Sequence, residues 1–203
     1  MTRTLTALFS FLFLASNALA QATPEQASKA IVEESSAKIK EAVLSAKTDD
    51  EMREKVKVLM ETFVDFQEFG RICLIDHFDK LSKADQQRYL AEFKKLLQRS
   101  YLRRFKAGRD FKLTYRGEPQ LNKTGDRVMV KTTLASGDVT ADVDYRFFKS
   151  NDKWLAYDII IDEVSMSRNY RKSFAKIMDK DGLEELLKKM AKKSQEDGDN
   201  DDI

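Results

Sequence analysis

The sequence has few of the residues that cross-link a chain by disulfides or separate it into domains. Its 203 residues include one cysteine, Cys73, so no disulfide can form within the chain. Cys73 lies in an apolar Ile-Cys-Leu-Ile segment, which favours a small buried core residue over a reactive thiol. Only two prolines occur, Pro24 and Pro119, and the middle of the chain has no glycine- or serine-rich run. These absences predict one domain without an internal linker.

Residues with the usual catalytic chemistry are also scarce. The single histidine, His77, lies in a polar His-Phe-Asp-Lys segment that is typical of a surface turn. The sequence has no cluster of metal ligands, no nucleophile motif and no phosphate-binding loop, so it predicts neither a metal nor another cofactor. The net charge of only +2 disfavours nucleic-acid binding, which normally needs a strongly basic surface.

The two ends of the chain differ in composition from the rest. Arg3, the short apolar run after it and the small-x-small sequence at residues 18–20 predict a cleavable signal peptide over residues 1–20. The run is too short to span a membrane, which takes about 20 residues, and no second apolar stretch is long enough. We therefore expect a soluble, exported protein; an uncleaved N-terminal anchor is the alternative. Residues 194–203 are polar and acidic, which predicts a disordered tail and leaves 21–193 as the domain.

Apolar residues in the first half and last third of the chain recur every three or four positions, which is typical of helices. Pro24 suits the first position of a helix, and Ser82 followed by Asp85 resembles a capping box at the start of a longer one. The predicted helices cover residues 24–45, about 49–63, 66–74, a long segment that begins after Ser82 and reaches Phe105, then 167–178 and 182–192.

Between these helical parts the apolar period changes to two, which indicates strands. Ser136-Gly137 and the polar residues 150–152 mark tight turns. The predicted strands cover residues 111–115, 127–134, 138–147 and 154–161. Helices, then four strands joined by short turns, then helices indicate an α+β fold whose antiparallel sheet has one covered face.

One segment carries a motif more specific than any periodicity. It reads W-x-x-Y-D-x6-S-x3-N-Y-R-x2-F and consists of Trp154, Tyr157, Asp158, Ser165, Asn169, Tyr170, Arg171 and Phe174. This motif resembles the MlaC family, also called toluene-tolerance auxiliary proteins. Further similarities are the aromatic–Gly–Arg stretch ending in Phe69-Gly70-Arg71, Tyr101 late in the long helix, and the closing Gly-x-x-x-Leu helix at Gly182. One departure is that the family often has a tryptophan soon after the Gly-Arg region, where this chain has none.

The resemblance implies an NTF2-like arrangement, in which N-terminal and C-terminal helices cradle a curved four-stranded antiparallel sheet. It also implies a periplasmic carrier that shuttles phospholipids between the outer and inner membranes, as the soluble component of an Mla-type ABC transport system that serves outer-membrane asymmetry. The implied partners are a phospholipid ligand, an inner-membrane MCE-type ABC transporter complex and an outer-membrane lipoprotein complex. A hopanoid or sterol-type lipid carrier and a ligand-free periplasmic adaptor are the alternatives. We expect a monomer.

Lipid carriage requires a deep apolar pocket, because at ~0.8 kcal/mol per CH₂ two chains of about 15 methylenes cost roughly 24 kcal/mol to expose. The chain has 13 Phe and 6 Tyr, and the apolar faces of the sheet and the long helix could form the walls. The alternative is that these side chains only pack against each other. The predicted lipid-binding residues are Leu97, Tyr101, Phe105, Val130, Val143, Tyr145, Phe147, Tyr170 and Phe174.

Asp158 interrupts an otherwise apolar strand, where an unpaired charge would be costly. We predict that Asp158 pairs with Arg171 and that the two act as structural polar anchors between the last helix and the sheet. The basic residues between 94 and 109 predict a solvated helix face, or else a positive rim for lipid phosphates or an acidic partner. An enzyme is a further alternative: a buried Asp/Tyr pair in the pocket would favour it, and a pocket that is apolar to its base would favour a carrier.

Overall fold

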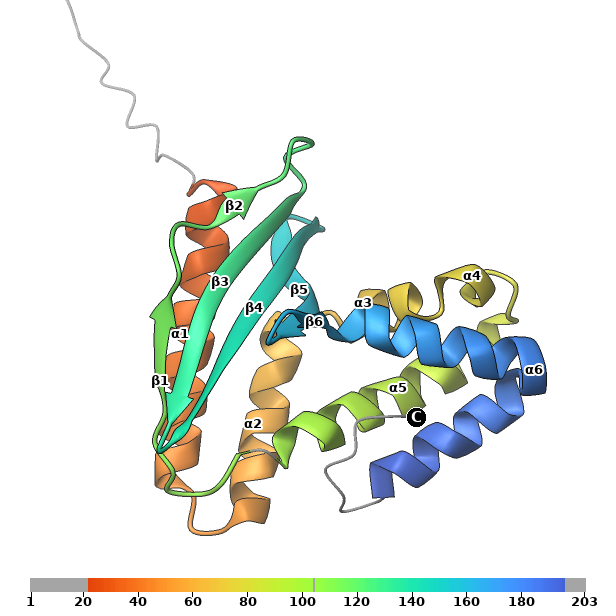
Figure 1. Cartoon of the computed structure of the whole chain (residues 1–203), viewed down its shortest axis with the longest axis horizontal. Helices are drawn as coiled ribbons and strands as arrows, with labels where there is room; N and C mark the ends of the chain where they lie inside the picture. Colours follow the sequence, from red (N-terminus) through yellow and green to blue (C-terminus); the bar gives the residue numbers. More distant parts are fainter. Residues whose placement is uncertain (1–21, 104, 196–203) are drawn as a thin grey trace, which may run out of the picture.

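The computed structural model describes residues 22–103 and 105–195, which form an antiparallel sheet with helices packed against it (Figure 1). This confirms the α+β prediction. The predicted signal peptide and residues 196–203 of the predicted tail lie outside the described residues. The elements follow in the order α1 (Pro24–Ser45), α2 (Asp49–Phe63), α3 (Phe66–Cys73), α4 (Ile75–Phe78), α5 (Lys83–Leu102), β1 (Lys112–Tyr115), β2 (Gln120–Leu121), β3 (Arg127–Ser136), β4 (Val139–Ser150), β5 (Lys153–Ile161), β6 (Val164–Ser165) and α6 (Met166–Gln195).

The first two helices begin where the sequence supplies caps. The Thr23 hydroxyl accepts a hydrogen bond from the Gln26 amide, and the Gln26 side chain accepts one from the Thr23 amide, so a capping box precedes Pro24. Thr48 caps α2 by accepting from the Glu51 amide. The two helices lie side by side and run antiparallel (Figure 1). The predicted bounds of both are confirmed.

The sheet has six strands rather than the predicted four. Its order is β1-β3-β4-β5-β6, and β2 also pairs with β3. The missed strands, β2 and β6, have two residues each, too few to show an alternating pattern. A register shift between Arg146 and Phe147 in the β4–β5 pair bends the sheet locally, next to the motif strand.

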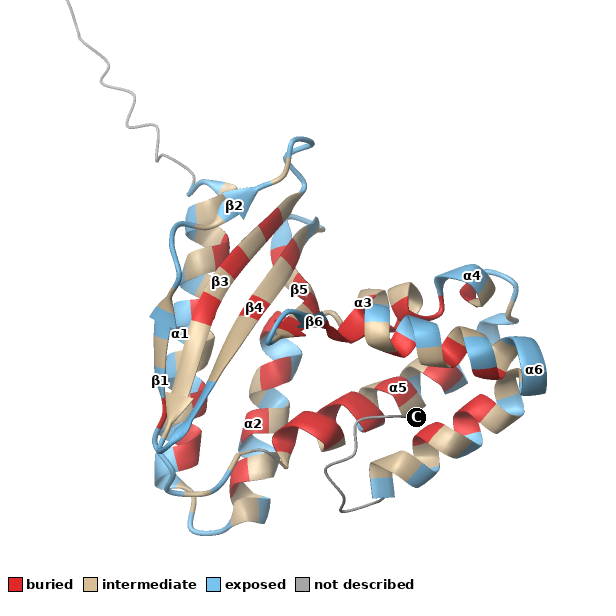
Figure 2. Cartoon of the chain, viewed as in Figure 1, coloured by how far each residue is buried: buried red, intermediate tan, exposed pale blue. Residues whose placement is uncertain are grey.

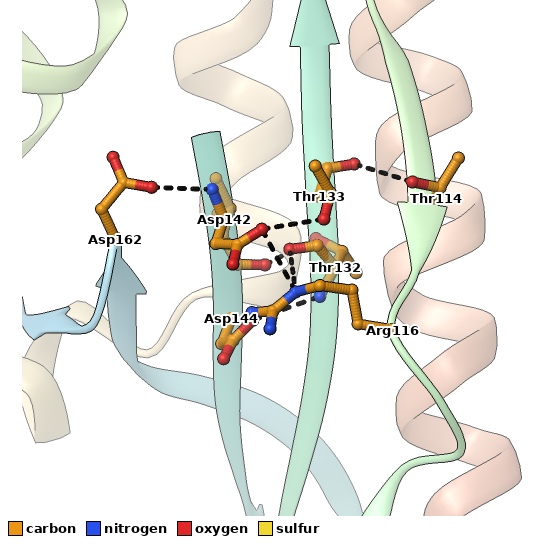
Figure 3. Close-up of polar contacts among 8 residues, drawn as sticks. Thr114, Arg116, Thr132, Thr133, Asp142, Asp144 and Asp162 are labelled. Atoms are coloured by element: carbon orange, nitrogen blue, oxygen red, sulfur yellow. Dashed lines mark hydrogen bonds and ion pairs between the residues drawn. The ribbon is translucent and has the colours of Figure 1, made fainter. Parts of the chain in front are cut away.

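The two faces of the sheet differ in polarity, because successive side chains along each strand point to opposite faces. On the face toward α1, Val130 pairs with the aromatic Tyr145, and both side chains are apolar over most of their surface. On the opposite face, Arg116 forms ion pairs with Asp142 and Asp144, at nitrogen–oxygen distances of 3.2 and 2.7 Å (Figure 3). The α1 side is therefore the better suited of the two faces to an apolar ligand.

Helices α3, α4, α5 and α6 form a helical layer beside the β5–β6 edge (Figures 1 and 2). Phe93 of α5 lies at its centre. The Phe93 ring centroid is 5.6 to 6.3 Å from those of the aromatic side chains around it, which are Phe69, Tyr89, Tyr170 and Phe174. This aromatic core is continuous with the buried residues Val130 and Phe147 of the sheet.

The chain reverses direction inside α6. We expected two helices, 167–178 and 182–192, and α6 indeed consists of two helical parts that meet at Gly182. Gly182 has a φ of +78°, in the region that glycine adopts without strain, and this reversal lets the second part fold back along α5 (Figure 1). Helix α6 extends to Gln195, so Ser194 and Gln195 are helical rather than part of the predicted tail.

Asp158 joins the sheet to the helical layer, but not through Arg171 as predicted. The Asp158 side chain is fully buried and accepts hydrogen bonds from Arg146 at 3.0 Å, from the Ser165 hydroxyl at 2.7 Å and from the Ser167 amide at 2.9 Å. The predicted pair is wrong, because Arg171 is exposed and contacts Asp76 at 2.9 Å. The reason is geometric: Arg146 lies directly opposite Asp158 in the sheet, and the first turn of α6 presents its amides to the carboxylate.

We expect the loss of the Asp158 carboxylate to destabilise the fold much more than the loss of the Asp76 carboxylate. Asp158→Ala removes one member of a buried ion pair and leaves the Ser167 amide without its acceptor, so it should lower the free energy of unfolding by about 3–5 kcal/mol. Asp76→Ala, which breaks the exposed pair with Arg171, should cost less than about 1 kcal/mol. Denaturant unfolding of both variants, and of the intermediate Asp158→Asn, measures this. Equal losses for the two alanine variants would contradict the anchor role of Asp158.

Candidate functional site

A small cavity lies between α1 and the apolar face of the sheet. Its volume is about 50 Å³. The lining side chains come from α1, the end of α2, the segment after α5, and strands β1, β3 and β4, and they are Val32, Ser35, Ser36, Ile39, Phe63, Phe105, Phe111, Leu113, Leu134 and Tyr145. This set contains no carboxylate, amine, guanidinium or imidazole, so the cavity offers no general acid or base near neutral pH.

The polar atoms around this cavity are hydroxyls. Burial raises the pKa of Tyr145 to about 12, with smaller contributions from Tyr115 and Asp144, so its hydroxyl stays protonated at physiological pH. The Ser36 hydroxyl donates to the carbonyl of the residue three positions earlier in α1, at 3.0 Å. The Ser28 hydroxyl, buried on the same helix, has no hydrogen-bond partner among the described residues. The surroundings are suited to an uncharged apolar group.

Two phenylalanines from the segment between α5 and β1 form one wall of the cavity. The Phe105 and Phe111 rings meet edge to face, with their centroids 6.2 Å apart. Lys40 of α1 contacts this segment beside the cavity: its Nζ lies 2.8 Å from the Asp110 carboxylate and donates to the Phe111 carbonyl at 3.3 Å. The aromatic wall is thus tied to the helix that forms the opposite wall.

The same segment, residues 105–111, is also held to the hairpin of α1 and α2. The Gly108 amide donates to the Val43 carbonyl at 2.8 Å, and the Ala107 amide donates to the Asp49 carboxylate at 2.8 Å. The bond from Ala107 is the largest cause that lowers the pKa of Asp49, followed by the bond from Lys106, so the carboxylate stays ionised at neutral pH. These contacts fix the backbone that carries Phe105 and Phe111.

The structure places the predicted lipid-binding residues of the sheet on one face but not all at the cavity. Tyr145 lines it, as does Phe105 from the segment after α5. Val130, Val143 and Phe147 share the face of Tyr145, and Val130 and Phe147 are fully buried in the core beside it. None of these three lines the cavity.

The predicted residues from the helical layer lie elsewhere. Tyr170 and Phe174 pack against Phe93 in the aromatic core and do not line the cavity. Leu97 and Tyr101 are buried on α5, and the Tyr101 hydroxyl contacts the sulfur of a methionine at the start of α6. Sequence periodicity could not distinguish these residues, because an apolar stripe looks the same in a core and in a pocket.

The sequence reasoning missed the α1 wall of the cavity. Val32, Ser35, Ser36 and Ile39 lie at spacings of three and four, which place them on one face of the helix. That spacing was available in the sequence. The two serines weaken the apolar signal of this face, however, so the sequence pattern favours the long middle helix as a wall.

Other features of the described residues do not suggest chemistry. A larger depression between α1 and α2 has four charged residues among the eight that line it, so it is poorly suited to an apolar ligand. No group of metal-ligating side chains occurs in the described part of the chain, and none of its helices is long and apolar enough to cross a membrane. His77 is half-buried rather than on an open turn, with its Nε2 3.4 Å from Asp179.

The fold and the cavity together define a class: an α+β protein with an uncharged, apolar cavity on the covered face of its sheet. The chain belongs to the MlaC family, whose model, described as MlaC protein, matches residues 29–192. Proteins of this family bind lipids and are not enzymes, which sets the enzyme alternative aside.

A solved structure has the same fold. It is the phospholipid-binding protein from Ralstonia solanacearum, determined in complex with a phospholipid, and it is similar with a TM-score of 0.72 and 22% sequence identity. The match covers 85% of this chain and 97% of that one. No curated protein sequence matches the chain.

The contact between Asp49 and Ala107 should control the opening of the 105–111 segment. Asp49→Ala removes the acceptor, so we expect the Ala107 amide to exchange its hydrogen faster, by about tenfold if roughly 1.4 kcal/mol of local stability is lost. Asp49→Asn keeps an acceptor oxygen and should change the rate much less. Hydrogen exchange followed by mass spectrometry or NMR measures both variants, and unchanged protection in Asp49→Ala would show that the segment is held by other contacts.

Proposed function

We propose that this protein is a periplasmic carrier of phospholipids, which holds their acyl chains between α1 and the apolar face of the sheet. The single observation that carries the proposal is the uncharged cavity at this position in a chain of the MlaC family. The similarity to a protein determined with a bound phospholipid supports the choice of ligand. On this proposal the protein is the soluble component of an Mla-type ABC transport system.

The cavity must widen to accept this ligand. Pockets for molecules of drug size or larger measure about 300–1,000 Å³, several times the 50 Å³ present here. The 105–111 segment is the part of the wall best able to move, because a few hydrogen bonds and exposed ion pairs hold it, whereas the sheet wall is fixed by its ladder. Outward movement of Phe105 and Phe111 together with α1 would bring Val130 and Phe147 to the wall of the widened cavity.

Widening is favourable when acyl chains fill the space. Each methylene removed from water contributes about 0.8 kcal/mol, so even one chain of about 15 methylenes supplies roughly 12 kcal/mol to offset the loss of α1 packing. The cavity residues offer no charged group to a lipid head group. We infer that the head group stays in water and that the protein selects its ligand mainly by the acyl chains.

The proposed route of the lipid runs between two membrane partners. An inner-membrane MCE-type ABC transporter complex and an outer-membrane lipoprotein complex would exchange lipid with the carrier, and export would rest on the signal peptide predicted over residues 1–20. A partner is needed on physical grounds, because a lipid buried this deeply leaves slowly without one.

Native mass spectrometry of the protein purified from a periplasmic fraction, followed by extraction of bound lipid, tests the proposal. We expect one diacyl phospholipid per protein molecule. Recovery of a hopanoid or sterol would keep the cavity as the site but change the ligand class. A folded protein that carries no lipid, and that stays empty after incubation with phospholipid vesicles, would overturn the proposal in favour of an adaptor.

A cavity-filling substitution tests the location. Leu134→Trp places a bulky ring in the cavity, so the fraction of protein that carries lipid should fall several-fold while the fold is retained. Leu121→Trp makes the same change at an exposed position of β2 and should leave occupancy unchanged. The ratio of lipid-bound to empty protein in native mass spectra gives the result, and full occupancy in Leu134→Trp would place the acyl chains elsewhere.

A further inference from the structure

A row of four positive side chains runs along the first part of α6. Arg168, Lys172, Lys176 and Lys180 are spaced four residues apart, and all four are exposed. Neighbours at this spacing lie about 6 Å apart on one side of a helix, and the row as a whole is about 18 Å long. We call these four residues the cationic row.

The cationic row has no counter-charges of its own. None of its four side chains makes an ion pair or hydrogen bond with any described residue. In α1 and α2 the same spacing carries opposite charges, as in the Lys38–Glu34 pair at 2.6 Å and the Lys55–Glu51 pair at 2.8 Å. Like charges four residues apart destabilise a helix, and no ion pair among the described residues offsets this repulsion within the row.

Most acidic residues near the row are engaged elsewhere. Asp76 pairs with Arg171, Glu184 pairs with Arg88 at 2.8 Å, and Asp179 lies against His77. Asp181, next to the end of the row, and Glu163, before its start, are exposed and without a described ion pair, and the exposed Asp179 lies three residues from Lys176, so acidic charge is present at both ends of the row. The middle of the row remains available to an anionic partner.

We propose that the cationic row is a docking surface for membranes that contain anionic phospholipids. The inference deepens the proposed function, because a phospholipid carrier must approach membranes. Three of the four residues are lysines, which are depleted in protein–protein interfaces but act as flexible point charges toward phosphates. A row of separate, flexible charges matches a fluid array of phosphates better than a fixed set of carboxylates on a protein.

The energetics predict a weak, salt-sensitive contact. Each lysine or arginine near an anionic lipid surface strengthens binding by about fivefold, so neutralising three of them should weaken it on the order of 100-fold. The interaction decays over about 8 Å at physiological ionic strength, so added salt should reverse it. The row lies on the helical layer and none of its residues lines the cavity, so its removal should not affect lipid occupancy.

Vesicle co-sedimentation tests this docking surface. The probes are phosphatidylcholine vesicles with and without phosphatidylglycerol. The row variant is Lys172→Gln/Lys176→Gln/Lys180→Gln, and the control is Lys112→Gln/Lys123→Gln/Lys153→Gln, which removes three charges from exposed lysines of the sheet region that have no described ion pair. We expect the parent and the control to bind only the anionic vesicles, and the row variant to bind them on the order of 100-fold more weakly.

Equal binding by the row variant and the control, or no binding of the parent to anionic vesicles at low salt, would overturn the proposal. Native mass spectrometry of the same samples separates this result from the proposed function. A parent protein that carries phospholipid but ignores anionic vesicles contradicts only the docking surface. A protein that is empty of lipid yet binds these vesicles through the row contradicts only the carrier function.

Discussion

The buried carboxylate of Asp158 is the contact on which the arrangement of the two layers depends. It lies in the sheet, is neutralised by Arg146 from the neighbouring strand, and accepts the Ser167 amide at the start of α6. A single charged side chain thereby fixes where the last helix begins. Because α6 supplies Tyr170 and Phe174 to the aromatic core, the position of the helical layer follows from that contact.

The two layers differ in how firmly they are packed, and this difference matters for function. The helical layer has a dense aromatic core around Phe93, whereas the space between α1 and the sheet contains the cavity and a wall held by a few polar contacts. On the proposed function, the ligand space expands on the α1 side while the helical layer keeps its packing. The cationic row lies on the helical layer, so docking and ligand exchange can involve different parts of the molecule.

The sequence was most informative where the physics is local. Pro24, the Ser82–Asp85 capping signal and the alternating pattern of β3 predicted where these elements begin, because such signals act within a few residues. The sequence also predicted that Asp158 needs a partner, since a buried charge is costly. It did not predict which residue that partner is, because only the register between β4 and β5 places Arg146 opposite Asp158. The cavity was predicted at Tyr145 and Phe105 but missed at Ser35 and Ser36, since which side chains pack and which border a space depends on the assembled tertiary structure.

The helical layer is assembled from distant parts of the chain, and this has a consequence for biosynthesis. Helix α5 presents Phe93 and Tyr89 long before the 30 residues of α6 that cover them have been made, and the Arg88–Glu184 pair joins positions 96 residues apart. Such non-local contacts slow folding. A growing chain therefore keeps an aromatic surface uncovered until synthesis is nearly complete, and a product that ends before α6 would expose that surface and tend to aggregate.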